Sequence, residues 1–265
     1  MIHLTEFRRR FPERSLTLDG TEWRYFDTGG DGPVLVMLPG GQGTGEVFYR
    51  QAQDLGGVIR MIGLSYPGGR DPAAVASGLR SFLGALGLDH VNLLGTSFGG
   101  YIAQLFAASF PDACGCLILS NSFVDPGPAV EAWPPAADLE AVPAPKFQAD
   151  AVAKIEASTD LRPHYRELNA LLADQLGGRQ SAESFKGRVI GVRTATALPP
   201  VAIPQHNIVI IDCDDDPVLP PAVREQLAER YPEAERHRLS WGDHYPAILR
   251  AEEYSAIVAN RLIFC

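Results

Sequence analysis

The chain has 265 residues, of which 46% are hydrophobic, 21% charged and 9% aromatic, a globular composition that excludes a disordered chain. Its 23 basic and 32 acidic residues give a net charge of −9, which disfavours nucleic acid and anionic membrane surfaces as partners. Four cysteines are too few for a disulfide framework and no apolar run reaches the roughly 18 residues of a membrane-spanning helix, so we expect a cytoplasmic protein without a membrane span.

The first expected element is a β-hairpin over residues 15–27, where Asp19-Gly20 is typical of a tight turn. Short, nearly continuous apolar runs then predict strands that are buried on both faces, at residues 34–38, 58–64, 91–94, 116–120 and 208–211. Segments with helical patterns alternate with these runs, at residues 73–86, 99–110, 222–231 and 252–262. This alternation predicts a doubly wound, mostly parallel α/β sheet.

Residues 124–204 follow a different pattern. Prolines are frequent at both ends of this segment, helical patterns cover residues 146–157 and 165–176, and no convincing strand is present. Because the strand pattern resumes after it, we expect a helical cap inserted into an α/β core that residues 1–123 and 205–265 form.

A serine motif, Gly95-Thr96-Ser97-Phe98-Gly99, lies between a predicted strand and a predicted helix. In this context G-x-S-x-G forms a sharp turn that lifts the serine hydroxyl above the edge of the sheet, and the glycines remove clashes across the turn. A glycine-rich loop without a catalytic role is the alternative interpretation. The position between strand and helix favours Ser97 as a nucleophile.

A serine nucleophile needs a histidine base and an acid that orients it, and in this kind of fold the acid precedes the histidine along the chain. Of the six histidines, His244 alone lies in a loop after the last predicted strand, residues 234–239, so we expect it to be the base. The turn Asp216-x-x-x-Pro220 favours Asp216 as the acid. Asp215 remains an alternative, because a step of one residue reverses the direction of the side chain.

The acidic run that contains these two residues starts at Asp212 and has the alternation of a calcium-binding loop. Pro217 stands where such a loop requires glycine, and Val223 stands where it requires glutamate. We therefore expect no metal site there.

Two backbone N–H groups should stabilise the negative charge that develops on the substrate carbonyl oxygen. We expect these donors at Phe98, directly after the nucleophile, and at Gly41 in the glycine-rich loop 39–45. That loop lacks the glycine spacing of the nucleotide-binding motifs, so no cofactor is expected. Phe98, Phe123, Trp133 and Tyr245 are expected to form apolar walls for a small or medium-sized acyl group.

Together these motifs resemble an α/β-hydrolase, and more narrowly the maspardin-type branch. The narrower resemblance covers most of residues 7–123 and 205–262 and rests on Pro39, on Gly43-Thr44 and on residues 47–51, 65–67, 117–123, 231–234 and 242–246. It implies the α/β-hydrolase fold, and matching along the branch would place the acid at Asp215. Maspardin is usually regarded as a binding or regulatory protein, so the resemblance also implies an adaptor with a protein partner.

The residues as a set predict a serine hydrolase that cleaves a carboxylic ester or similar acyl bond of a small-molecule substrate through an acyl-enzyme. The main alternative is a maspardin-like binding or adaptor protein with weak or no hydrolase activity. Hydrolysis of a C–C bond, or the sensing of a small ligand, would also be compatible with the fold.

Overall fold

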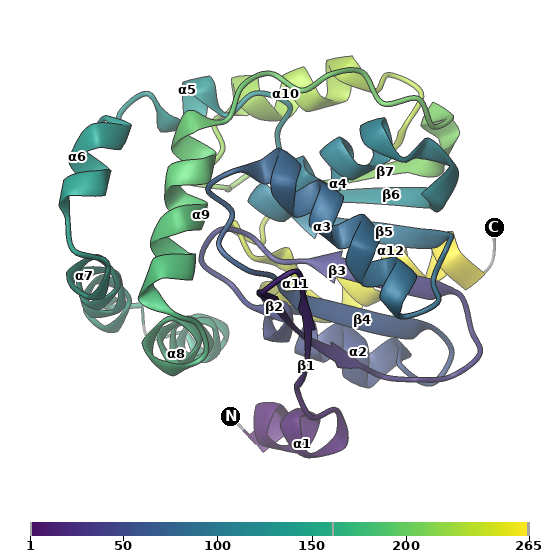
Figure 1. Ribbon diagram of the computed structural model, residues 1–265, viewed down its shortest axis with the longest axis horizontal. Coiled ribbons are helices and arrows are strands. Elements are labelled where there is room, and N and C mark those ends of the chain that lie inside the picture. The colour runs from purple at the N-terminus through teal and green to yellow at the C-terminus, as the bar shows by residue number, and fades with distance from the viewer. Residues whose placement is uncertain (1, 161, 264–265) are drawn as a thin grey trace.

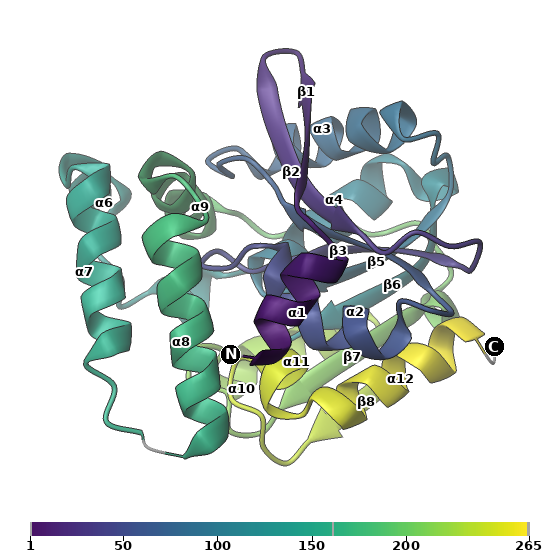
Figure 2. The ribbon, with the colours of Figure 1, turned by 90° about the horizontal axis from the view of Figure 1, so that it is seen from below.

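A single mixed sheet forms the centre of the protein in a computed structural model that describes residues 2–160 and 162–263 (Figures 1 and 2). Among these residues the sheet has eight strands in the order β1-β2-β4-β3-β5-β6-β7-β8. Strand β2 pairs antiparallel with β1 and with β4, and all other neighbours pair in parallel. The predicted mostly parallel, doubly wound sheet is therefore confirmed.

The strands are β1 (Arg14–Leu18), β2 (Thr21–Asp27), β3 (Val34–Leu38), β4 (Arg60–Ser65), β5 (Val91–Thr96), β6 (Cys114–Ser120), β7 (Ile208–Cys213) and β8 (Glu235–Leu239). Strands β3 to β7 are largely buried along their length, as their continuous apolar sequences require. Strand β8 lies at the edge and has the sequence ERHRL, in which charged side chains protect an open strand edge from pairing with another chain.

Helices cover both faces of the sheet (Figures 1 and 2). On one face, apolar side chains of α3 (Pro72–Ala85), α4 (Phe98–Ser109) and α10 (Pro221–Arg230) share a core with the strands. On the other face the same role belongs to α1 (Ile2–Arg10), α2 (Tyr49–Leu55), α11 (Pro246–Leu249) and α12 (Ala251–Ile263). The sequence predictions omitted α1 and α2. In the part of the chain that is described, no helix combines the length and the apolar character needed to cross a bilayer.

The described residues of the segment 124–204 contain helices and no strand. The helices are α5 (Gly127–Val130), α6 (Ala136–Ala141), α7 (Ala144–Glu156), α8 (Pro163–Gly178) and α9 (Ala182–Thr194). Helices α6 to α9 lie together at one side of the sheet, on the left of Figures 1 and 2. Short 3-10 helices connect elements elsewhere, at Gly45–Phe48, Pro111–Ala113 and Gln205–Asn207.

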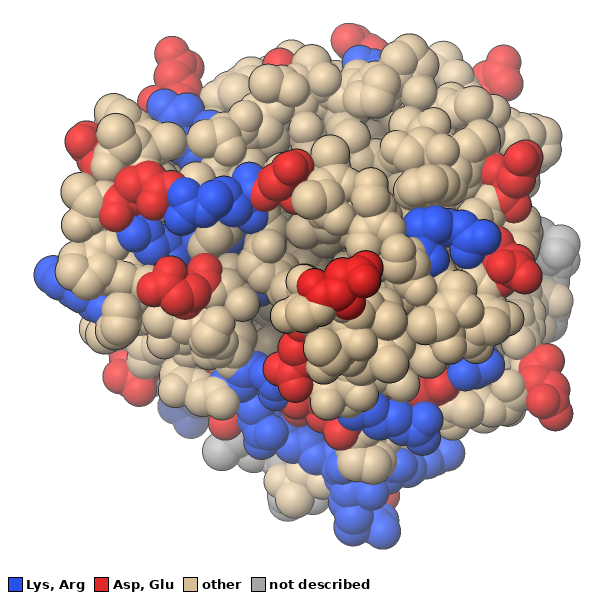
Figure 3. Space-filling model, in the orientation of Figure 1, with Lys and Arg blue, Asp and Glu red and all other residues tan. Residues whose placement is uncertain are grey.

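Basic side chains gather at one edge of the protein despite its net charge of −9. Figure 3 shows Lys and Arg along the lower edge of this face, where Figure 1 has α1 and β1. Three arginines occupy the last turn of α1, where positive charge stabilises the helix dipole. One of them, Arg8, forms an ion pair with Glu46 at 2.6 Å and a second with Asp174 of α8. These ion pairs connect α1 to the 3-10 helix Gly45–Phe48 and to α8.

Gly63 lets an aromatic ring pack directly on the sheet. It pairs across strands with Phe26, and a Cβ at this position would overlap the Phe26 ring. That ring in turn meets Phe7 of α1 edge to face, with the ring centroids 5.0 Å apart. The absence of a side chain at position 63 thus makes room for the contact between α1 and the sheet.

We expect the substitution Gly63→Ala to lower the free energy of unfolding by about 1–3 kcal/mol, because the new methyl group must displace the buried Phe26 ring. Gly57→Ala is the matched control, since a Cβ there meets no atom within 4 Å. Urea denaturation measures both changes. Equal unfolding midpoints for the two variants would contradict this account of the packing.

Candidate active site

Ser97 stands between β5 and α4 in a strained backbone conformation, with φ 52° and ψ −123°. A positive φ is uncommon for any residue other than glycine, and it persists only where the surroundings fix it. Here the Ser97 N–H donates to Ser120 O at 2.9 Å. The Ser97 carbonyl accepts from Ser122 Oγ at 2.8 Å and from the Gly100 N–H at 3.0 Å. Contacts from the end of β6 therefore hold the serine in its turn.

The glycines around Ser97 are required by close backbone approach. A Cβ on Gly95 would overlap Gly99 O, and a Cβ on Gly99 would overlap Leu38 O at the end of β3. A Cβ on Gly100 would overlap the Ser122 hydroxyl that holds the Ser97 carbonyl. The glycines of the G-x-S-x-G motif are thus required because the turn is packed between the ends of β3 and β6.

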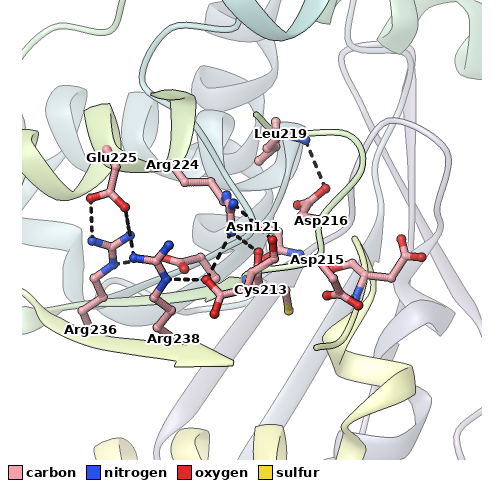
Figure 4. Close-up of polar contacts among 12 residues, drawn as sticks. Asn121, Cys213, Asp215, Asp216, Leu219, Arg224, Glu225, Arg236 and Arg238 are labelled. Atoms are coloured by element: carbon pink, nitrogen blue, oxygen red, sulfur yellow. Dashed lines mark hydrogen bonds and ion pairs between the residues drawn. The ribbon is translucent and has the colours of Figure 1, made fainter. Parts of the chain in front are cut away.

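His244 and Asp216 form a buried pair. His244 lies in the loop between β8 and α11, and its Nδ1 is 2.8 Å from Asp216 Oδ2. The Asp216 side chain is fully buried, and its Oδ1 accepts the N–H groups of Val218 at 2.7 Å and Leu219 at 3.1 Å, the latter drawn in Figure 4. Because an ionised carboxylate only accepts hydrogen bonds, Nδ1 carries the proton and Nε2 is left to accept one.

Asp215 does not contact the imidazole ring. It is exposed, and its Oδ1 accepts the N–H of Asp243 at 2.9 Å, which braces the loop that carries His244. Asp212 pairs with Arg236 at 2.9 Å, and Asp214 pairs with Arg238, both arginines being on β8. Among these four acids, Asp216 is the one that reaches the histidine. Within the described residues, no group of three or more His, Cys, Asp or Glu side chains is arranged to bind a metal ion.

Ser97 and His244 line the same cavity, which has a volume of about 430 Å³. Its walls come from the loops after the strands and from the inserted helices, and they include Phe123, Trp133 and Tyr245. No Asp, Glu, Lys or Arg of the described chain is part of this lining. The Ser97 hydroxyl makes no direct hydrogen bond to the imidazole, a common situation in structures without substrate. The cavity is suited to an uncharged, apolar group beside the serine.

The loop after β3 lies against the serine. A Cβ on Gly40 would be 3.2 Å from Ser97 Cβ, and the next residue, Gly41, lines the cavity. Neither the Gly41 N–H nor the Phe98 N–H has a hydrogen-bond acceptor in the described part of the chain. Of these two residues, Gly41 lines the cavity, whereas Phe98 is fully buried and is not part of the lining. The oxyanion-hole role of the two amides stays a prediction.

Two supporting residues were absent from the sequence predictions, Asn121 and Arg224 (Figure 4). Asn121 follows β6 with φ 39°, donates to Asp243 O at 2.8 Å and accepts from the Cys213 N–H at 3.1 Å. The buried Arg224 of α10 donates to the carbonyls of Cys213 and Asp214, the latter at 3.3 Å. Together they hold the acid turn and the histidine loop. The position of Asn121 at a strand end was visible in the sequence, but its partners were not.

Comparison with known proteins shows what this chain is similar to. Residues 33–148 match the family described as alpha/beta hydrolase fold. Maspardin from Homo sapiens is 28% identical over 265 residues, which cover 97% of this chain and 85% of maspardin.

Solved structures agree on the fold. A hydrolase from Pseudomonas aeruginosa is similar with a TM-score of 0.77 and 20% identity, over 95% of this chain and 98% of that chain. An enol-lactonase from Burkholderia xenovorans is similar with a TM-score of 0.76 and 19% identity, over 94% of this chain and 99% of that chain. The expected α/β-hydrolase fold is confirmed. The chain has the α/β-hydrolase fold and is similar to maspardin over nearly its whole length.

Proposed function

We propose that this protein is a serine hydrolase that cleaves a carboxylic ester or a similar acyl bond. The observation that carries the proposal is the buried His244–Asp216 pair, 2.8 Å apart, whose imidazole lines the same cavity as the strained Ser97. A histidine oriented by a buried carboxylate beside a serine hydroxyl is the arrangement that activates serine for attack on a carbonyl carbon.

In the proposed reaction, Ser97 Oγ attacks the carbonyl carbon while His244 Nε2 takes its proton. The carbonyl oxygen becomes an oxyanion that the N–H groups of Gly41 and Phe98 stabilise. When the tetrahedral intermediate collapses, the imidazolium returns the proton to the leaving alkoxide, which departs as an alcohol. Water, deprotonated by His244, then hydrolyses the acyl-enzyme and restores the Ser97 hydroxyl.

In this reaction Asp216 orients and stabilises His244 and does not itself accept a proton. Its buried carboxylate fixes the ring through Nδ1 and stabilises the imidazolium that forms during each proton transfer. The N–H groups of Val218 and Leu219 keep the carboxylate in place. The base thus has a fixed tautomer and a fixed direction.

The inserted segment 124–204 acts as a cap that sets the shape of the substrate site. Trp133, Leu172 and Val192 from this segment line the same cavity as Ser97, together with Phe123 and Tyr245 from the core. With no charged side chain in the described lining, the favoured substrate is an ester of an uncharged, apolar acyl group.

Labelling with a fluorophosphonate probe tests the nucleophile, because such a probe reacts with an activated serine. We expect the folded wild-type protein to be labelled and the Ser97→Ala variant to remain unlabelled. Circular dichroism and the unfolding midpoint confirm that both proteins are folded. If folded wild-type protein takes no label that depends on Ser97, the hydrolase proposal fails and a maspardin-like binding or adaptor protein replaces it.

The two neighbouring acids provide a matched pair of substitutions. We expect Asp216→Asn to reduce kcat for a short-chain aryl ester by about 10³- to 10⁴-fold, because the amide favours the wrong tautomer of His244. Asp215→Asn should change kcat by less than about 10-fold, since the remaining amide oxygen still accepts the Asp243 N–H. Steady-state kinetics measures both effects, and the reverse ranking would reassign the acid to Asp215.

A further inference from the structure

The backbone of residues 39–44, which we name the oxyanion loop, has few ties to the strand from which it emerges. Tyr66 Oη donates to Pro39 O at 2.8 Å, and within the loop the Gly43 N–H donates to Gly40 O at 3.2 Å. Neither bond involves the carbonyls of Gly41 and Gln42 or the N–H of Thr44.

Those partners come from the inserted segment 124–204. Arg188 Nε donates to Gly41 O at 3.1 Å, and Gln180 Nε2 donates to Gln42 O at 2.8 Å. The Thr44 N–H donates to Gln175 Oε1 at 2.9 Å. Three polar side chains, on α8, on α9 and on the connection between them, therefore hold three backbone groups of the oxyanion loop.

Arg188 is the centre of this arrangement. It is 2% exposed, and its other nitrogens donate to Tyr66 O at 3.4 Å and to Gln180 Oε1, while its guanidinium lies 5.6 Å from the centroid of the Tyr66 ring. No carboxylate of the described chain forms an ion pair with it. Burying a cation costs free energy unless its N–H groups have acceptors. The acceptors Gly41 O and Tyr66 O therefore hold the Arg188 side chain, and Arg188 in turn holds Gly41 O. Burial lowers the pKa of Arg188, yet an arginine remains charged at neutral pH.

Because residue 41 is a glycine, the hydrogen bonds from Arg188 and Gln180 are needed to fix its backbone conformation. A glycine backbone has no strong preference of its own, so the direction of the Gly41 N–H depends on what anchors the neighbouring peptide groups. Anchoring Gly40 O on one side and Gly41 O and Gln42 O on the other fixes the conformation of Gly41. The N–H of Gly41, which has no acceptor in the described chain, then keeps one direction at the edge of the cavity.

We propose that Arg188, supported by Gln180, is a positioning residue that aims the Gly41 N–H at the developing oxyanion. The inserted segment thereby completes the oxyanion hole, in addition to shaping the substrate cavity. A movement of α9 away from the core would release the Gly41 peptide, so closure of this segment and formation of the oxyanion hole are coupled. The proposal rests on the hydrolase function proposed above.

The test compares Arg188→Met with Arg193→Met on the same helix. Arg193 donates to Pro134 O at 3.1 Å and does not contact the oxyanion loop, so it is a matched control for the loss of a guanidinium from α9. We expect Arg188→Met to lower kcat for an aryl ester by about 10- to 100-fold with KM changed less than about 3-fold, because the oxyanion forms only after substrate has bound. The pH profile should be unchanged, since His244 and Asp216 are not altered. The control should retain kcat within about 2-fold.

A second readout does not depend on activity. Hydrogen–deuterium exchange of a peptide that spans residues 39–48 should be faster in Arg188→Met and unchanged in Arg193→Met, because the first substitution frees the oxyanion loop. Gln180→Ala, at a half-buried position, tests the same support if Arg188→Met does not fold, and we expect faster exchange and a smaller loss of kcat.

The outcomes separate the two proposals. If wild-type protein hydrolyses no ester, the proposed function fails, while the exchange measurement still tests whether Arg188 and Gln180 hold the loop. Unchanged exchange, or unchanged kcat in an active enzyme, would overturn the positioning role. An equal loss of kcat in Arg193→Met would likewise overturn it, because the effect would then come from the helix as a whole.

Discussion

Ser97 has a backbone conformation with φ 52° that its own side chain disfavours, and the candidate site is organised around it. The conformation is possible because glycines at positions 95, 99 and 100 let β3, β6 and the start of α4 approach the turn closely. The Ser97 N–H then donates to Ser120 O, and the Ser122 hydroxyl donates to Ser97 O, which holds both peptide groups of the serine. These contacts come from the mostly parallel sheet, at whose carboxyl edge polar side chains from different strands meet.

The acidic cluster after β7 shows how one carboxylate is selected for chemistry. Arg236 and Arg238 on the neighbouring β8 pair with Asp212 and Asp214, which neutralises two of the charges. Asp215 faces outward and holds the histidine loop through the Asp243 amide. The Asp216 side chain points into the interior, where it accepts two backbone N–H groups and contacts the imidazole of His244. The acidic residues next to Asp216 therefore have structural roles, and Asp216 is the one whose buried carboxylate contacts the histidine.

The sequence predicted those features that depend on local pattern. Continuous apolar runs identified the inner strands, and the strand–helix context singled out Ser97. The choice between Asp215 and Asp216 depends on which side chain turns inward, and contacts with the distant histidine loop decide that direction. Helix α9 was missed because Lys186 and Arg188 are buried on it, so its apolar period is weak. Helices α1 and α2 were missed as well. The hydrogen bonds between the oxyanion loop and Arg188, Gln180 and Gln175 join residues more than 130 positions apart, and no local pattern encodes them.

Trapping the acyl-enzyme tests the central claim most directly, because it reports the covalent bond that Ser97 is proposed to form. Wild-type protein mixed with an activated aryl ester is quenched in acid within the first turnover, digested and analysed by peptide mass spectrometry. The account predicts one acyl group, on the peptide that contains Ser97, and none on that peptide in the Ser97→Ala variant. An active enzyme that carries the acyl group on another residue, or hydrolyses the ester without Ser97, would contradict it.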